Sequence, residues 1–178
     1  LYVDDYLYDQ SRFSESRQSR RVDRAYDAPI GALSFNWNSV NVFVRPGASS
    51  GEPARAFADP ENEFVTLKNN CKTGRKTEIQ VGRHTHGDRD VITVSGTIAV
   101  GDKEQVVYKS ISAPEFWAGY NFKAFLNQQG ISYGGTVLKK AVPSSANLLV
   151  TYKSKPLRDI VADMAKFSNN YVAEMITM

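Results

Sequence analysis

Residues 155–175 read KPLRDIVADMAKFSNNYVAEM, and this stretch decides the fold of the chain. Ser154 can cap a helix that Pro156 opens in its first turn, where the missing N–H of proline costs nothing. An apolar stripe follows at spacings of four, three and four residues, made of Ile160, Met164, Phe167 and Tyr171. The pattern predicts an amphipathic helix that starts just after Ser154.

Three small polar residues, Ser168-Asn169-Asn170, interrupt this stripe before a second helical stretch over residues 171–178. Serine and asparagine compete with helical hydrogen bonding and favour caps and turns. One interpretation is therefore a C-cap followed by an N-cap. The other is a functional elbow whose side chains are held between two packed apolar faces.

Composition limits the possible classes of protein. The chain has 178 residues, 42% hydrophobic and 23% charged, which suits a folded chain of one domain or two small ones. A net charge of +3 does not indicate nucleic-acid or membrane binding, and no apolar run reaches the roughly 20 residues of a membrane span. The single Cys71 excludes an internal disulfide, and a start at Leu1 suggests a processed or excised segment.

The clearest strand signal lies in residues 28–47. Leu33, Phe35 and Trp37 alternate with small polar residues, Asn38-Ser39 can turn, and alternation resumes after it. A hairpin is expected here. Further strands are expected at 1–9, 64–70, 78–83, 90–100, 131–137 and 148–152, and a helix that Ser112-Ala113-Pro114-Glu115 opens as a capping box should end at Gly130.

These segments, in this order, resemble the D-alanyl-D-alanine carboxypeptidase/endopeptidase family, the class C low-molecular-mass penicillin-binding proteins. The resemblance rests on the Ala28-Pro29 to Arg45-Pro46-Gly47 segment, the glycine-bounded helix, and the run from Ser154 to Glu174. In that family a Ser-x-Pro-Leu turn leads a helix into Ser-x-Asn. Ser-x-Asn acts together with Ser-x-x-Lys and Lys-Thr-Gly.

The resemblance implies an α+β fold in which two β-rich accessory domains, one nested in the other, interrupt a transpeptidase-like catalytic domain. Residues 1–47 and 98–153 would form one accessory domain and residues 48–97 the nested module. Residues 154–178 would begin the returning catalytic domain with its Ser-x-Asn helices.

The implied activity is that of a serine-type D-Ala-D-Ala carboxypeptidase of peptidoglycan in the periplasm, working through an acyl-enzyme. Ser168 and Asn170 are the expected catalytic residues. No cofactor or metal is implied. The implied partners are peptidoglycan stem peptides, beta-lactams as inhibitors, and the remaining segments of the same enzyme, with no nucleic acid and no membrane span.

The nucleophile motif is missing from this chain, because no lysine has a serine three positions before it. The nearest approach, Thr136-Val137-Leu138-Lys139, lies on an expected strand. The chain is therefore expected to be the middle segment of the enzyme and inactive alone. The alternatives are a non-catalytic cell-wall or protein-binding module, or a relative that has lost the chemistry.

Other candidate sites are weaker. Lys72-Thr73-Gly74 spells the third family motif, but it precedes Ser-x-Asn and is interpreted as a hairpin turn. His84 and His86, with Asp88 and Asp90, could share a strand face around a metal, but nothing completes a zinc shell. Cys71 lacks a nearby base. The arginine-rich residues 11–24 are interpreted as a solvated loop, with a polyanion site as the less favoured alternative.

Overall fold

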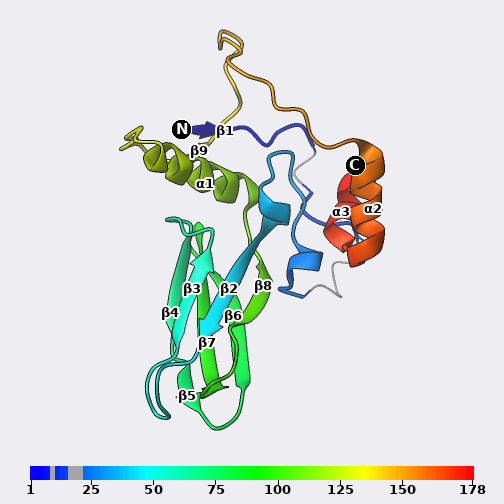
Figure 1. Ribbon diagram of the computed structural model, residues 1–178. Coiled ribbons are helices and arrows are strands. Elements are labelled where there is room, and N and C mark those ends of the chain that lie inside the picture. The colour runs from blue at the N-terminus through cyan, green and yellow to red at the C-terminus, as the bar shows by residue number, and fades with distance from the viewer. Residues whose placement is uncertain (9–10, 16–21) are drawn as a thin grey trace.

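The computed structural model describes residues 1–8, 11–15 and 22–178 (Figure 1). The helices are α1 (Pro114–Gln128), α2 (Leu157–Phe167) and α3 (Asn170–Thr177), with two 3-10 turns, η2 (Ala25–Asp27) and η3 (Asn36–Asn38). The strands are β1 (Tyr2–Val3), β2 (Ser39–Arg45), β3 (Arg55–Asp59), β4 (Val65–Asn69), β5 (Lys72–Gly74), β6 (Glu78–His86), β7 (Arg89–Ala99), β8 (Gln105–Ser110) and β9 (Leu138–Lys139). The mixture of helices and a β-rich body agrees with the expected α+β class.

A three-stranded antiparallel sheet in the order β3-β2-β8 forms the first layer. Its central strand alternates, because Val40, Val42 and Val44 are fully buried while the residues between them are not. On the other face, Phe43 lies opposite Phe57 with the rings stacked 4.9 Å apart. The alternation predicted for residues 40–44 is therefore confirmed.

The second layer is centred on β7, which pairs with β4 and β5 in parallel and with β6 in an antiparallel hairpin. The hairpin turns at Gly87, whose φ is +64°. Gly96 lies inside β7 at a position where only glycine fits. Its φ is +90°, and a Cβ there would lie 2.0 Å from the carbonyl oxygen of Glu78.

The hydrophobic core joins the two layers. Buried residues of β2 and of β7 belong to one cluster, which also includes Trp117 of α1. Helix α1 lies at one end of the sheets (Figure 1). This cluster includes residues from both of the ranges assigned to the accessory domain and to the nested module. The division of the chain at residues 48–97 thus remains a proposal.

The predicted hairpin over residues 28–47 is wrong in its first half. No strand of the described ranges pairs with this half, and distant residues bond its backbone instead. The N–H of Leu33 donates to the Asp5 side chain at 2.9 Å, and the Trp117 indole donates to the carbonyl of Phe35 at 3.1 Å. Asn36, Trp37 and Asn38 follow in left-handed conformation, which no strand can continue. Strand β2 pairs instead with β3, the next strand along the chain, and with β8, which is distant in the sequence.

Three other predicted strands are wrong or shortened. Of the strand predicted at residues 1–9, the described residues 1–8 contain only β1, which pairs in parallel with β9. The stretch 131–137 is not a strand, and Gly134-Gly135 gives it no side chains to pack. Residues 148–152 have no strand partner within the described ranges, and their apolar side chains lie open, with Leu149 93% exposed.

Helix α1 is confirmed, ending before Gly130 at φ +77°, but the predicted capping box is wrong. Ala113 occupies the N-cap position without a side-chain hydrogen bond, and the buried hydroxyl of Ser112 has no partner among the described residues. The Glu115 side chain is committed to ion pairs instead, since Arg12 lies at 2.7 Å and Lys139 at 3.0 Å.

These ion pairs belong to a buried charge cluster of Asp5, Arg12, Glu115 and Lys139. Arg12 contacts Asp5 at 2.6 Å, and both carboxylates are at most 5% exposed. Members come from the N-terminal segment, α1 and β9, so the cluster ties together parts of the chain that are far apart in sequence. Buried carboxylates require such partners because an unpaired buried charge is costly.

No helix in the described ranges is both long enough and apolar enough to cross a lipid bilayer.

Candidate functional site

The polar triplet forms the elbow between α2 and α3. Ser168 ends α2 in a left-handed conformation, with φ 51° and ψ 42°. Asn169 begins α3 as its N-cap, and its side-chain oxygen accepts the N–H of Val172 at 3.2 Å. The interpretation as a C-cap followed by an N-cap is therefore confirmed. The predicted cap at Ser154 is wrong, because its hydroxyl donates to the carbonyl of the adjacent Lys155.

A small apolar cluster anchors the elbow to the body of the chain. Tyr171 and Val172 are 6% exposed and pack with Ala28 and Ile30. Burial raises the pKa of the Tyr171 phenol, although a hydrogen bond with Ser34 opposes this shift. The segment predicted as a strand thus acts as the support on which α3 rests.

Three residues of the predicted stripe face this cluster, but Phe167 does not. Ile160 and Met164 pack on the cluster together with the buried Tyr171. Phe167 is 54% exposed, and its ring lies 5.9 Å from that of Trp37. The last turn of α2 therefore contacts a different part of the chain.

Ser168 and Asn170, the expected catalytic residues, lie on the open side of the elbow. Ser168 is exposed and Asn170 is half-buried, whereas Asn169 is only 4% exposed. Among the described residues, neither the Ser168 hydroxyl nor the Asn170 amide has a side-chain hydrogen bond. A hydroxyl donates once and accepts twice, so Ser168 is equipped to pass a proton between two partners.

Asn169, and not Asn170, supplies the side chain that caps α3. Asn169 is the buried member of the triplet. Asn169 has a structural role of its own, so its substitution is not silent.

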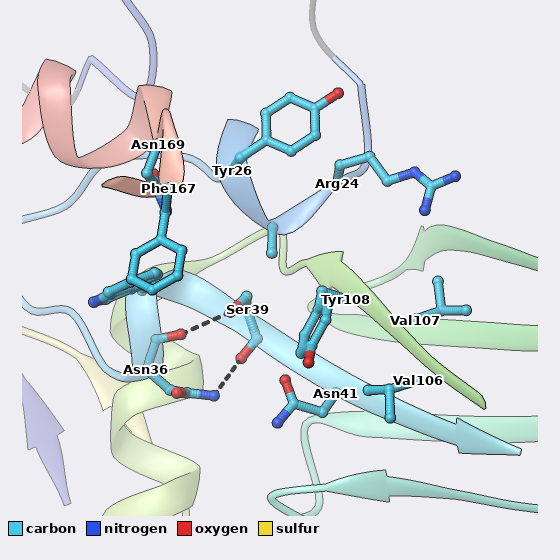
Figure 2. Close-up of a pocket in the computed structure, with 12 residues that line it drawn as sticks. Arg24, Tyr26, Asn36, Ser39, Asn41, Val106, Val107, Tyr108, Phe167 and Asn169 are labelled. Carbon is cyan, nitrogen blue, oxygen red and sulfur yellow. Dashed lines mark hydrogen bonds between the residues drawn. The ribbon is translucent and has the colours of Figure 1, made fainter. Parts of the chain in front are cut away.

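A cleft of about 820 Å³ lies beside the elbow, between the helix pair and the β2–β8 strands (Figure 2). Phe167 and Asn169, the two neighbours of Ser168, both line it. The other lining residues are mostly aromatic, amide or apolar: Arg24, Ala25, Tyr26, Asn36, Trp37, Ser39, Asn41, Val106, Val107 and Tyr108.

A left-handed turn presents Trp37 to this cleft. The φ angles of Asn36, Trp37 and Asn38 are 50°, 53° and 50°, a conformation that costs on the order of 1–3 kcal/mol for each non-glycine residue. The buried Asn38 amide holds the turn by donating to the Pro29 carbonyl at 2.9 Å. Two hydrogen bonds join Ser39 and Asn36: the Asn36 side-chain amide donates to the Ser39 carbonyl, and the Ser39 hydroxyl donates to the Asn36 carbonyl (Figure 2). The turn is thus fixed before any ligand binds.

The weaker candidates lie elsewhere. Lys72-Thr73-Gly74 is strand β5 and not the predicted turn, and it lies at the end of the sheets opposite α2 and α3 (Figure 1). Thr73 is buried, and its hydroxyl accepts the N–H of Gly47 at 2.7 Å. This motif is therefore not part of the elbow site.

The histidine group does not form a metal site in the described part of the chain. Asp90 is fully buried and bonds Thr85 at 3.0 Å and the N–H of Ser112 at 2.8 Å. Burial also raises the pKa of the Cys71 thiol, which disfavours a nucleophilic role.

The arginine-rich segment can be described only in part, because Arg17, Arg20 and Arg21 lie outside the described residues. Arg12 belongs to the buried charge cluster, and Arg24 borders the cleft.

The sequence did not reveal the cleft, because its walls come from four separate segments. The only local signal was an aromatic residue between two asparagines at residues 36–38.

Known families and solved structures include relatives of this chain. The model of the D-Ala-D-Ala carboxypeptidase 3 (S13) family matches residues 1–178. A curated D-alanyl-D-alanine carboxypeptidase of Actinomadura sp. (strain R39) is 28% identical over 192 residues, covering 99% of this chain. The chain spans 34% of the length of that relative.

Two solved structures of penicillin binding protein 4 (dacB) from Haemophilus influenzae share the fold. One, complexed with a beta-lactam, is 22% identical with a TM-score of 0.59 and covers 83% of this chain and 34% of its own. The other is 19% identical with a TM-score of 0.61 and covers 85% of this chain and 34% of its own.

Proposed function

Since the chain belongs to the D-Ala-D-Ala carboxypeptidase 3 (S13) family, we propose that it is the middle segment of a serine-type D-Ala-D-Ala carboxypeptidase/endopeptidase of peptidoglycan. The family match over the whole chain and the coverage of about a third of a curated relative support this proposal. The absence of Ser-x-x-Lys from the sequence is consistent with a nucleophile in another segment of the same protein.

The proposed chemistry is acyl transfer. A serine outside this chain attacks the carbonyl that precedes the terminal D-alanine, D-alanine leaves, and water then hydrolyses the acyl-enzyme. The bond to D-alanine breaks only when its nitrogen receives a proton. A hydroxyl close to that nitrogen can pass the proton on from the lysine of Ser-x-x-Lys.

Ser168 is the proposed proton relay and Asn170 the proposed orienting amide. The observation that carries this assignment is the open side of the elbow. Among the described residues both polar groups lack side-chain hydrogen-bond partners there, while the neighbouring Asn169 is buried. The apolar cluster around Tyr171 fixes the position of both residues. A rigid support is what a positioned proton relay requires.

The proposed domain division places residues 154–178 in the returning catalytic domain. Residues 1–47 and 98–153 form the accessory domain, and residues 48–97 form the nested module. The packing of α3 on Ala28 and Ile30 supports a fixed contact between the elbow and the accessory part.

The proposed partners are peptidoglycan stem peptides, beta-lactams as inhibitors and the remaining segments of the same enzyme. The proposed place of action is the periplasm, and no cofactor is required.

Labelling with a fluorescent penicillin tests the proposal. The complete protein should be acylated, whereas the isolated 178-residue chain should not. Acylation of the isolated chain would show that the roles are assigned wrongly. A complete protein that does not react would favour the non-catalytic wall-binding or protein-binding module.

A further inference from the structure

Three edge strands of the two sheets are bonded to a neighbouring segment. On β8, the N–H of Ser110 donates to the Asp23 carbonyl at 3.2 Å. On β5, the N–H of Thr73 donates to the Glu52 carbonyl at 2.7 Å. On β6, the N–H of Arg83 donates to the Asp23 side chain at 3.3 Å. These contacts obstruct the approach of a further strand to the three edges.

Strand β3 has no such cover. Among the described strands it pairs with β2 alone, and the backbone of residues 55–59 bonds nothing else in the described part of the chain. Alternate N–H and C=O groups of an edge strand point away from its sheet, so β3 presents a row of unused donors and acceptors. Lysine and proline usually protect an edge, and neither occurs in this strand, which reads RAFAD.

Two hollows border β3. Phe57 and Asp59 point away from the core, whereas Ala56 and Ala58 pack against it. The outer hollow, of about 640 Å³, is lined by Phe57 and Asp59 and extends to α1. The inner hollow, of about 310 Å³, is lined by Ala56 and Ala58 and extends to Val65 and Leu67 of β4. Side chains of a strand alternate between its two faces, so successive residues of an added strand point to the outer and the inner hollow in turn.

Each hollow is lined by an asparagine with a buried polar atom that has no partner in the described ranges. In the outer hollow, Asn121 is fully buried and its Nδ2 donates to the Trp117 carbonyl at 2.8 Å, which leaves Oδ1 unbonded. In the inner hollow, Asn62 accepts the N–H of Phe64 through Oδ1 at 2.8 Å, which leaves Nδ2 unbonded. Such atoms are costly unless a partner completes them. One requires a donor and the other an acceptor, and a peptide chain supplies both.

Charge and size select the side chains of the added strand. Asp59 and Glu61 line the outer hollow and form no ion pair in the described ranges. Arg45 also lines it, but its guanidinium is paired with Glu104. A basic side chain therefore suits the outer hollow, because its charge meets the carboxylates while its stem packs on Phe57. The inner hollow is small and mostly apolar, so it suits a residue such as valine.

We infer that the free edge of β3 binds an extended segment of a partner protein in which basic and apolar residues alternate. The segment joins the three-stranded sheet as a fourth strand, so main-chain hydrogen bonds supply affinity and the two hollows supply specificity. Strand β3 lies on the side of the β-rich body away from α2 and α3 (Figure 1). The inference therefore does not depend on the proposed function of the elbow.

The test is fluorescence anisotropy of the complete protein with a labelled, end-blocked octapeptide that alternates lysine and valine. The parent should bind this peptide. In an added strand, the N–H groups of one alternate set face β3 and those of the other set face outward. N-methylation of one set should therefore weaken binding by about tenfold or more, and N-methylation of the other set should change it little.

Variants test the two hollows. The double variant Asp59→Asn with Glu61→Gln should weaken binding by about tenfold, because both carboxylates of the basic side chain are lost. Glu63→Gln is the matched control, since this exposed glutamate pairs with Lys123 and lines neither hollow. Asn121→Ala should weaken binding by about threefold to tenfold. Thermal melting checks that each variant is folded.

Several results would overturn the inference. The first is a parent protein that does not bind the peptide, as when another part of the same protein covers the edge. The second is equal binding of the parent to the plain peptide and to both N-methylated peptides. The third is a folded double variant that binds like the parent. A complete protein that dimerises in size-exclusion chromatography and excludes the peptide would place a second copy on the edge and refute the inference as well.

Discussion

The side-chain oxygen of Asn169 accepts a hydrogen bond from the backbone N–H of Val172 at 3.2 Å. This bond starts α3 at the residue that follows Ser168 in the elbow. It satisfies one of the N–H groups that the first turn of a helix leaves without a partner. The position of the open elbow residues therefore depends on the one member of the triplet that is buried.

Asn169→Ala should lower the free energy of unfolding by about 1 kcal/mol, the usual cost of losing an N-cap. Asn169→Asp should retain most of the stability, because a carboxylate accepts the same bond and favours a helix N-terminus. Urea unfolding of the two variants and the parent measures the difference. Equal stabilities for Asn169→Ala and the parent would mean that the cap contributes nothing.

Removing the central arginine of the buried charge cluster should be costly. Arg12→Leu leaves the carboxylates of Asp5 and Glu115 buried with less compensating positive charge, so a loss of about 3–5 kcal/mol is expected. Arg45→Leu is the matched control, because its ion pair with Glu104 is exposed and should contribute at most about 1 kcal/mol. Thermal or urea unfolding compares them, and similar losses would refute the structural role of the cluster.

Stability should fall in acid partly through Asp23. Burial by itself would raise the pKa of this carboxyl, but the hydrogen bond and charge of Lys109 and the N–H of Arg83 lower it overall. A lowered pKa in the folded state gives stability that is present above the unfolded pKa and is lost as pH falls through the folded value. The loss should therefore begin below about pH 4.

Asp23→Asn should make the free energy of unfolding depend less on pH below about pH 4. The measurement is the free energy of unfolding of parent and variant at about pH 6 and about pH 3, and the difference between them should shrink at the lower pH. A constant difference would exclude Asp23 from the acid response.

Lys72→Ala in the complete protein should leave penicillin acylation within a few-fold of the parent. Lys72 lies on β5, at the end of the sheets far from α2 and α3 (Figure 1). Rates of labelling with a fluorescent penicillin provide the test. A hundredfold loss would show that the wrong lysine motif was set aside.

The sequence predicted best those elements whose signals are local. The alternation at Val40, Val42 and Val44 was sufficient because it reports directly on burial. The periodicity of residues 157–167 predicted the helix, and it placed the partly buried Ile160 and Met164 against the apolar cluster. Gly130 was also placed correctly after the end of α1, since its conformation favours glycine.

The errors arose where distant residues satisfy the backbone. The alternation of Leu33, Phe35 and Trp37 resembles a strand, but Asp5 and Trp117 bond that segment from far away in the sequence. Glu115, the glutamate of the predicted capping box, forms ion pairs with Arg12 and Lys139, which are also distant in the sequence. The cleft could not be predicted, because Trp37, Tyr108 and Phe167 meet only through tertiary packing.

The central claim is that the Ser168 hydroxyl relays a proton and that Asn170 orients its partners. The most direct measurement is the rate of D-alanine release from a stem pentapeptide by the complete protein and its Ser168→Ala variant. Release should slow by roughly 10²–10⁴-fold, the usual worth of general acid–base catalysis, with little change in melting temperature. Asn170→Ala should cost comparable activity, whereas Ser154→Ala, which removes an exposed hydroxyl ahead of α2, should not. Release by a folded Ser168→Ala protein at the parent rate would contradict the account and leave the elbow as a pair of helix caps.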